Sequence, residues 1–246
     1  MKLVLQTRDI QVLKFIFACR AVTYNQITRR HFKNVSGVVA RRRIKALVRA
    51  GYLRSSALQL LGKVTIVVQP LPKIWEAIGD AWPFEIENPH FKTESLEHDV
   101  RLAEVFLRFE RLHCFHSFYT ENLLCSSKAL ATQPNYEAAV KIHSDGILSI
   151  EGTGGKLQTY AVEMELSKKT PQRYQQKLVE YYISQGLDGI LYISPDPEIH
   201  RLIARIDSEV CNGRDSLLFF ASEEEVKTSE PRIIFKNKNE QVLEFK

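Results

Sequence analysis

The chain has 246 residues, of which 44% are hydrophobic and 26% are charged. This composition is typical of a globular protein, and it excludes collagen, coiled-coil rods and intrinsic disorder. No apolar run approaches the roughly 18 residues that a membrane-spanning helix needs, and the first apolar run is too short for a signal peptide. We therefore expect a cytoplasmic protein without membrane insertion.

The charge is unevenly distributed along the chain. Residues 1–70 contain 14 Lys and Arg residues and a single acid, Asp9, so this segment carries +13. The remaining residues carry −8, because they contain 20 basic and 28 acidic side chains. A segment this basic is typical of a surface that meets a polyanion.

The basic segment contains the pattern of a DNA-binding module. Helices are predicted over residues 7–21, 24–32 and 37–50, and strands over residues 52–58 and 64–69. Ser36 is a good N-cap for the third helix, and Gly51 is the residue type that ends a helix with positive φ. Three helices followed by a two-stranded wing predict a winged helix-turn-helix, whose third helix enters the major groove of DNA.

The basic side chains of this module are the candidate DNA-binding residues. Arg41 and Arg42 of the third helix are the candidates for contacts in the groove, and residues around it suit phosphates. The full set is Arg29, Arg30, Lys33, Arg41, Arg42, Lys45, Arg49, Arg54 and Lys63. The alternative is that these residues form only a solvated basic helix face.

Proline-rich sequence separates this module from the rest. A short turn of helix is predicted at residues 75–78 between prolines, and we place the domain boundary near residue 88. The prediction is a winged-helix domain over residues 1–70, a connector over 71–88 and a second domain over 89–246.

The second domain alternates helices and strands. Helices are predicted over residues 94–112, from residue 170 and over 197–207, and a loop surrounds residues 133–135. Strands are predicted over residues 115–119, 141–150, 158–166, 187–194, 217–220, 232–235 and 242–245. This order predicts an α/β domain around a mixed sheet, so the fold class is α/β, or α+β overall. The glycine-rich turn at 151–156 joins two strands and is therefore no phosphate loop.

The hairpin around this turn places acidic residues together. If Gly154 is the centre of the turn, Ser149 faces Thr159 and Asp145 faces Glu163, while Glu165 shares the face of Glu163. Like charges opposite one another destabilise a sheet, and Mg²⁺ or Mn²⁺ would relieve this repulsion, because hard cations bind carboxylates. The alternative is a slipped register that turns each acid separately to solvent.

These residues resemble a known family. Ser144-Asp145-Gly146, then Glu163-Met164-Glu165 on the next strand, then a helix with Arg173 and Lys177, resembles the PD-(D/E)xK nuclease core. A winged helix joined to such a core is similar to the MobC-type relaxases of mobilisable plasmids and the related replication-relaxation proteins. The resemblance implies a restriction-endonuclease-like sheet in which Asp145 and Glu163 hold the metal and Glu165 assists. His98, Asp99 and Glu121 also look like family positions.

The chain departs from the motif at two positions. Ser144 stands where the motif has proline, and Glu165 stands where the motif has lysine. Lys177 is the best candidate to supply the missing amine, with Lys168 second. The cation would lower the pKa of a bound water, and the lysine would orient that water or stabilise developing charge.

The function expected from these features is a metal-dependent DNA endonuclease, specifically a relaxase that nicks double-stranded plasmid DNA at a transfer origin. Relaxosome and coupling proteins are the further partners that the resemblance implies. The alternative is a non-catalytic DNA-binding regulator or relaxosome accessory protein with a degenerate nuclease domain. A third reading is a nuclease of defence or transposition.

The cysteines are Cys19, Cys114, Cys125 and Cys211, which lie far apart and form no CxxC pair. This spacing argues against disulfides and against a structural zinc site. We expect all four to be buried apolar residues.

Overall fold

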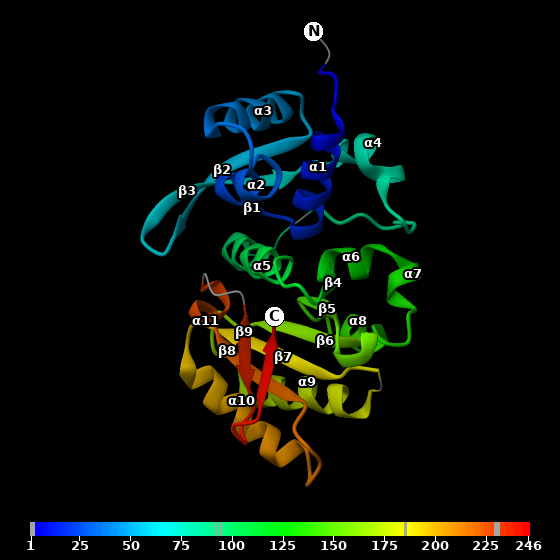
Figure 1. The fold of residues 1–246 in the computed structure, drawn as a ribbon, viewed down its shortest axis with the longest axis vertical. Coiled ribbons are helices and arrows are strands. Elements are labelled where there is room, and N and C mark those ends of the chain that lie inside the picture. Colours follow the sequence, from blue (N-terminus) through cyan, green and yellow to red (C-terminus); the bar gives the residue numbers. More distant parts are fainter. Residues whose placement is uncertain (1–2, 92, 94, 185, 229–231) are drawn as a thin grey trace. The chain divides into compact units, whose positions relative to one another are not determined.

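The computed structural model describes residues 3–91, 93, 95–184, 186–228 and 232–246 (Figure 1). The chain is mixed α/β, as predicted. It divides into two compact units, the first comprising Met1–Leu107 with Ser126–Lys128 and the second comprising Arg108–Cys125 with Ala129–Lys246. In the described part of the chain, no helix is long and apolar enough to cross a membrane.

The first unit combines helices with a small antiparallel sheet (Figure 1). Its first elements are α1 (Thr7–Cys19), β1 (Val22–Thr23), α2 (Tyr24–His31), α3 (Gly37–Arg49), β2 (Leu53–Leu60) and β3 (Lys63–Pro70). Among the described residues the strand order of this sheet is β1-β3-β2. As predicted, Ser36 caps α3, with its hydroxyl accepting a hydrogen bond from the Val39 amide at 3.4 Å.

The β2–β3 hairpin is longer than predicted. Leu60 pairs directly with Lys63, so only Leu61 and Gly62 form the turn. Both turn residues have positive φ, 48° at Leu61 and 76° at Gly62. This conformation matches the twist of the flanking strands, which can therefore pair up to the turn itself.

The predicted connector and the start of the next helix pack into the first unit. Residues 71–88 form η1 (Pro72–Ile74), α4 (Trp75–Ile78) and η2 (Gly79–Ala81), with Ile74 and Ile78 fully buried. They are followed by α5 (Leu96–Phe109), whose Val100 packs against Ala21 and Val67. The predicted boundary near residue 88 thus lies inside the first unit, because an apolar face of α5 is buried there. The predicted start of this helix at residue 94 lies outside the described residues.

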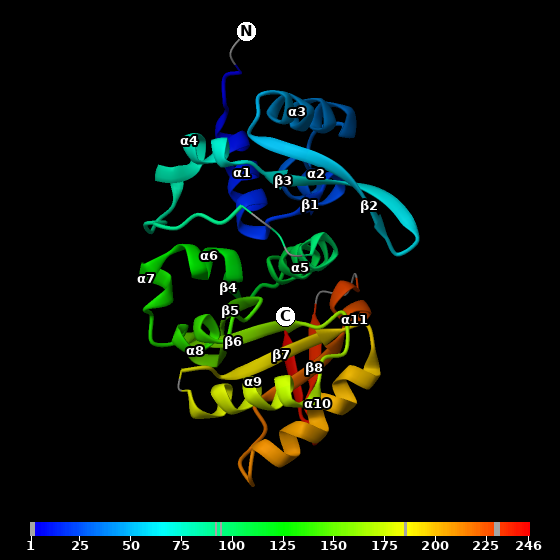
Figure 2. The same cartoon turned by 180° about the vertical axis from the view of Figure 1, so that it is seen from behind.

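The second unit is built on a mixed sheet. In the described part of the chain the sheet has seven strands in the order β10-β9-β8-β7-β6-β5-β4, with β6, β7 and β8 parallel. The strands are β4 (Phe115–Thr120), β5 (Gly146–Glu151), β6 (Leu157–Met164), β7 (Gly189–Ser194), β8 (Leu218–Ser222), β9 (Ile233–Lys236) and β10 (Val242–Phe245). The helices from β4 on are α6 (Glu121–Ser126), α7 (Lys128–Ala131), α8 (Glu137–Lys141), α9 (Pro171–Ile183), α10 (Pro197–Val210) and α11 (Glu223–Lys227), with η3 (Thr153–Gly155) between β5 and β6. Figure 2 shows α9 and α10 lying across one face of the sheet.

The β5–β6 hairpin has the predicted register. Ser149 lies opposite Thr159, and Gly146 lies opposite Val162 at the end of the ladder. Gly146 is required by close packing, since a Cβ there would lie 2.6 Å from the Phe118 ring. Asp145 immediately precedes this glycine, so the close packing at Gly146 also fixes the backbone position of Asp145.

Two expectations about the second unit are wrong. The strand predicted from residue 141 begins only at Gly146, and the segment before it contains the unpredicted helices α6, α7 and α8. His143, with a left-handed φ of 52°, lies in the turn that ends α8, shortly before β5 begins. Cys19 and Cys211 are buried as expected, but Cys114 and Cys125 are only partly buried.

Candidate functional site

Four predicted residues of the second unit form what we call the carboxylate–lysine cluster: Asp145, Glu163, Glu165 and Lys177. Electrostatic interactions connect all four side chains. Glu163 lies on β6 and Glu165 directly follows that strand, while Asp145 precedes β5. The Asp145 carboxylate accepts a hydrogen bond from the Met164 amide at 2.6 Å, which fixes it against the end of β6.

Helix α9 supplies the lysine. Thr170 caps this helix through the Arg173 amide at 3.4 Å, and Pro171 occupies its first turn, as the sequence predicts. Lys177 Nζ lies 2.5 Å from Glu163 Oε2. Helix α9 thus places an ammonium group beside Glu163. The motif would supply that amine from the strand, where this chain has Glu165 instead.

A buried tyrosine completes the contacts of Glu163. The Tyr181 hydroxyl, one turn beyond Lys177 on α9, donates to Glu163 Oε1. The Ser144 hydroxyl lies 2.5 Å from the same tyrosine oxygen. Sequence analysis did not identify Tyr181. Ser144, which replaces the motif proline, was the one unusual residue that could have indicated a hydrogen-bonding partner here.

Burial controls the charge of this cluster. Glu163 is 2% exposed, and this burial raises the pKa of its carboxyl to about 7, a rise that Lys177 opposes and Asp145 reinforces. Burial likewise raises the pKa of Glu165. Burial lowers the pKa of Lys177, but the nearby Glu163 and Asp145 carboxylates outweigh it and leave that pKa above its ordinary value.

The cluster has the donor set of a hard divalent cation. Asp145, Glu163 and Glu165 offer carboxylate oxygens, which Mg²⁺ and Mn²⁺ prefer. Tyr192 of β7 lies directly opposite Glu163 in the sheet, and its buried hydroxyl has no hydrogen-bond partner among the described residues. Because buried polar atoms are nearly always paired, this hydroxyl is an independent sign of a missing polar partner beside the carboxylates. The residues therefore fit such a cation.

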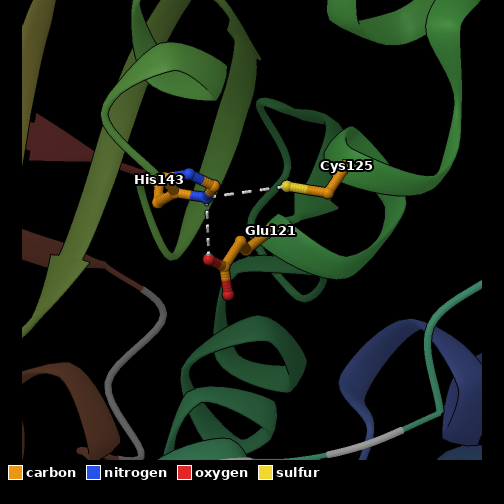
Figure 3. A group of neighbouring side chains, drawn as sticks. All are labelled: Glu121, Cys125 and His143. Atoms are coloured by element: carbon orange, nitrogen blue, oxygen red, sulfur yellow. Dashed lines mark hydrogen bonds and ion pairs between the residues drawn. The ribbon is translucent and has the colours of Figure 1, made fainter.

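The other predicted catalytic residues lie elsewhere. His98 and Asp99 belong to the first unit, where Asp99 pairs with Arg20 at 3.4 Å. Lys168, the second lysine candidate, is exposed. Glu121 begins α6 and lies beside Cys125 and His143, two residues that sequence analysis did not select (Figure 3).

Seven of the nine predicted DNA-binding residues are exposed. Arg41, Lys45 and Arg49 are exposed at successive turns of α3 and line a groove of about 890 Å³, whose other walls are α2 and the β2–β3 hairpin. Arg42 faces a different hollow, which it shares with Asp9 and Arg43. Lys33, Arg54 and Lys63 are exposed.

Two predicted phosphate contacts are engaged inside the unit instead. Arg29 forms an ion pair with Glu104 of α5. The Arg30 guanidinium lies 4.4 Å from the ring centre of Phe15 and 5.0 Å from that of Phe106. Both side chains therefore contact α5, and the sequence pattern did not predict these contacts.

Comparisons with protein-family models, with curated proteins and with solved structures found no match. We therefore infer function from the residues and their geometry.

Proposed function

We propose that the chain is a divalent-metal-dependent DNA endonuclease, which binds double-stranded DNA with its first unit and cleaves it with its second. The observation that carries this proposal is the convergence of Asp145, Glu163 and Lys177 from three separate segments. Carboxylates gathered at low exposure beside a lysine are costly to fold, because burial penalises their charged forms. Such an arrangement is typical of a functional site.

The residues divide the work of phosphodiester hydrolysis. Asp145, Glu163 and Glu165 would hold Mg²⁺ or Mn²⁺, which when bound lowers the pKa of a water and neutralises charge on the leaving oxygen. Lys177, with a side chain 20% exposed, would present its ammonium to the attacked phosphate and stabilise the charge that develops there. Hydrolysis adds water across one P–O bond and leaves a phosphate and a hydroxyl at the two strand ends.

DNA binding is assigned to a winged helix in the first unit. Support comes from the order of three helices and a hairpin, with α3 as the recognition helix and β2–β3 as the wing. Arg41, Lys45 and Arg49 line one groove against the hairpin, which suits them to the DNA backbone and groove.

Within this class we favour a cytoplasmic relaxase that nicks plasmid DNA at a transfer origin, acting with relaxosome and coupling proteins. Support comes from the resemblance of the joined winged helix and restriction-endonuclease-like sheet to the MobC-type proteins. The family position Glu121 lies in the same unit as the carboxylate–lysine cluster.

One observation favours a non-catalytic regulator as the second candidate. Lys177 and Tyr181 each contact one oxygen of Glu163, so both oxygens are already paired within the protein. Cleavage therefore requires the cation to compete with Lys177 for this carboxylate. If it does not, the second unit serves only in binding.

The decisive experiment is nicking of supercoiled plasmid, with and without a cognate transfer origin, in Mg²⁺ and then in EDTA. We expect Mg²⁺-dependent nicking that Asp145→Asn abolishes and that Asp215→Asn, an exposed acid of the same unit, leaves unchanged. Equal nicking of both plasmids would contradict the relaxase. Binding without cleavage in any divalent metal would establish the non-catalytic regulator, and full cleavage by Asp145→Asn would exclude this site.

A further inference from the structure

A second group of metal-binding side chains lies near the start of β5. Glu121 and Cys125 are one turn apart on α6, and His143 follows α8 (Figure 3). His143 Nδ1 lies 3.5 Å from Glu121 Oε1 and 3.9 Å from Cys125 Sγ. One ligand atom from each residue lies within 4.8 Å of the other two.

These separations match the edges of a tetrahedral zinc site. With Zn–N and Zn–O near 2.1 Å and Zn–S near 2.3 Å, tetrahedral angles place N and O about 3.4 Å apart and N and S about 3.6 Å apart. The observed separations of 3.5 and 3.9 Å need only small side-chain rotations to reach these values. Two of the three ligand separations are therefore close to those of a zinc site, and the third, between Glu121 and Cys125, is within 4.8 Å.

The backbone at the end of α8 fixes the position of His143. Its φ of 52° is in the left-handed region, which non-glycine residues seldom occupy. The Ser144 amide donates to the Ala139 carbonyl at 2.8 Å, and the Glu121 amide donates to the Asp145 carbonyl at 2.9 Å. These bonds fix the segment that carries His143 against α6. The His143 amide also donates to the Val140 carbonyl at 3.2 Å, so His143 is the left-handed residue that ends α8 after its C-cap Ile142.

We propose that Glu121, Cys125 and His143 form a binding site for Zn²⁺ or a similarly soft divalent cation, with a fourth position open to water or substrate. Thiolate and imidazole ligands select zinc over magnesium, so this site differs in chemistry from the carboxylate–lysine cluster. On binding, the Cys125 thiol releases its proton to solvent as the sulfur–metal bond forms. His143 is 70% exposed, which gives the ion a path of entry.

Bound zinc would join α6 to the segment that leads into Asp145. The inference does not rest on the proposed nuclease activity, because none of the three ligands belongs to the carboxylate–lysine cluster and the metal is different. It predicts stabilisation of the folded protein by zinc through mass action, whether or not the protein cleaves DNA.

The test is titration of the full-length, EDTA-treated protein with Co²⁺, a spectroscopic substitute for zinc, followed by displacement with Zn²⁺. We expect one equivalent of Co²⁺ to give a thiolate-to-cobalt charge-transfer band, which Zn²⁺ abolishes and excess Mg²⁺ does not. Cys125→Ser should lose the band, whereas Cys114→Ser, at the other partly buried cysteine, should keep it. No band, or a band that survives Cys125→Ser, would overturn the site.

Further variants test the remaining ligands and separate the two proposals. His143→Ala and Glu121→Gln should each weaken Zn²⁺ binding about tenfold or more, and His116→Ala, at an exposed histidine, should not. Unchanged zinc affinity in both ligand variants would reduce the cluster to an ordinary Glu–His ion pair. Asp145→Asn should retain the cobalt band even if it abolishes cleavage, so failure of either proposal is recognised independently.

Discussion

The two units treat charge in opposite ways. The first keeps most of the basic side chains of residues 1–70 exposed and buries the only acid of that segment, Asp9, which accepts a 2.9 Å hydrogen bond from Arg43. The second buries Glu163 beside further carboxylates, with the Lys177 ammonium 2.5 Å from its carboxylate. The first arrangement is inexpensive and suits long-range attraction of a polyanion. The second is costly, which is why we assign it the chemistry.

Because of this contrast, a change of pH has opposite effects on the stability of the two units. Burial, with Arg30 and Arg8 nearby, lowers the pKa of His31 from 6.5 to about 3. The stability that neutral His31 contributes is present above pH 6.5 and is lost as the pH falls. Burial raises the pKa of Glu163 from 4.5 to about 7, so the stability from its protonated form is present below pH 4.5 and is lost as the pH rises.

The largest effect is expected from replacing Lys177, because a loss of nicking in this variant would favour the endonuclease over the non-catalytic regulator. Lys177→Ala should reduce nicking about 10²–10³-fold, because a preorganised charge at the reacting phosphate would be lost. The measurement is the nicking rate of supercoiled plasmid at fixed Mg²⁺, with DNA binding followed by mobility shift. Lys168→Ala, at an exposed lysine before α9, is the matched control. Equal rates for Lys177→Ala and the wild type would remove Lys177 from the mechanism.

The next effect concerns the stability of the second unit without metal. Between pH 4.5 and 7, the wild type should lose about 3 kcal/mol of unfolding free energy relative to Glu163→Gln, whose amide does not titrate. Urea unfolding followed by far-ultraviolet circular dichroism in EDTA measures this difference at each pH. Only the change with pH is diagnostic, since the variant also leaves Lys177 unpaired. If the unfolding free energies of the wild type and Glu163→Gln changed in parallel with pH, burial would not raise the pKa of Glu163 in the folded protein.

A smaller effect should distinguish two neighbouring arginines on α3. Replacing Arg41 and Lys45 with alanine should weaken DNA binding and lower the log–log salt slope by about 0.9 for each phosphate contact removed. Arg42→Ala should have less effect, because Arg42 lies outside the groove that contains the other two. Binding measured over a salt series tests both, with the exposed Arg201→Ala of the second unit as control. A larger loss from Arg42 than from Arg41 would reverse the assignment of the groove.

The smallest effect concerns acid stability of the first unit. Between pH 6.5 and 5, the wild type should lose about 2 kcal/mol relative to His31→Gln, because His31 resists protonation when folded. Both tryptophans of the chain, Trp75 and Trp82, lie in this unit, so their fluorescence reports its unfolding selectively. Identical acid profiles for the two proteins would show that His31 becomes protonated without cost.

Several features of the site were predictable because they depend on neighbours in the chain. Ser36 and Thr170 cap α3 and α9 through residues three positions away. The register that opposes Ser149 and Thr159 follows from the position of one short turn. Local rules therefore brought Asp145 and Glu163 to the same end of one hairpin before any tertiary contact was considered.

Other features depend on partners that are distant in sequence. Arg29 and Arg30 belong to the same basic pattern as Arg41, yet α5 engages them through Glu104 and Phe106. This packing also extends the first unit beyond residue 88. This packing cannot be predicted from the local sequence, because the basic residues of a helix have the same spacing whether they face solvent or another helix.

The sequence by itself determined the caps of α3 and α9, the register of the β5–β6 hairpin and the concentration of basic charge in the first 70 residues. Only the tertiary structure decided that Lys177 reaches Glu163 and that His143 joins Glu121 and Cys125. The physical reason is that capping, turns and side-chain alternation act within a few residues. By contrast, the distances and burial that set the charge of Glu163 arise only when α9 packs on the sheet.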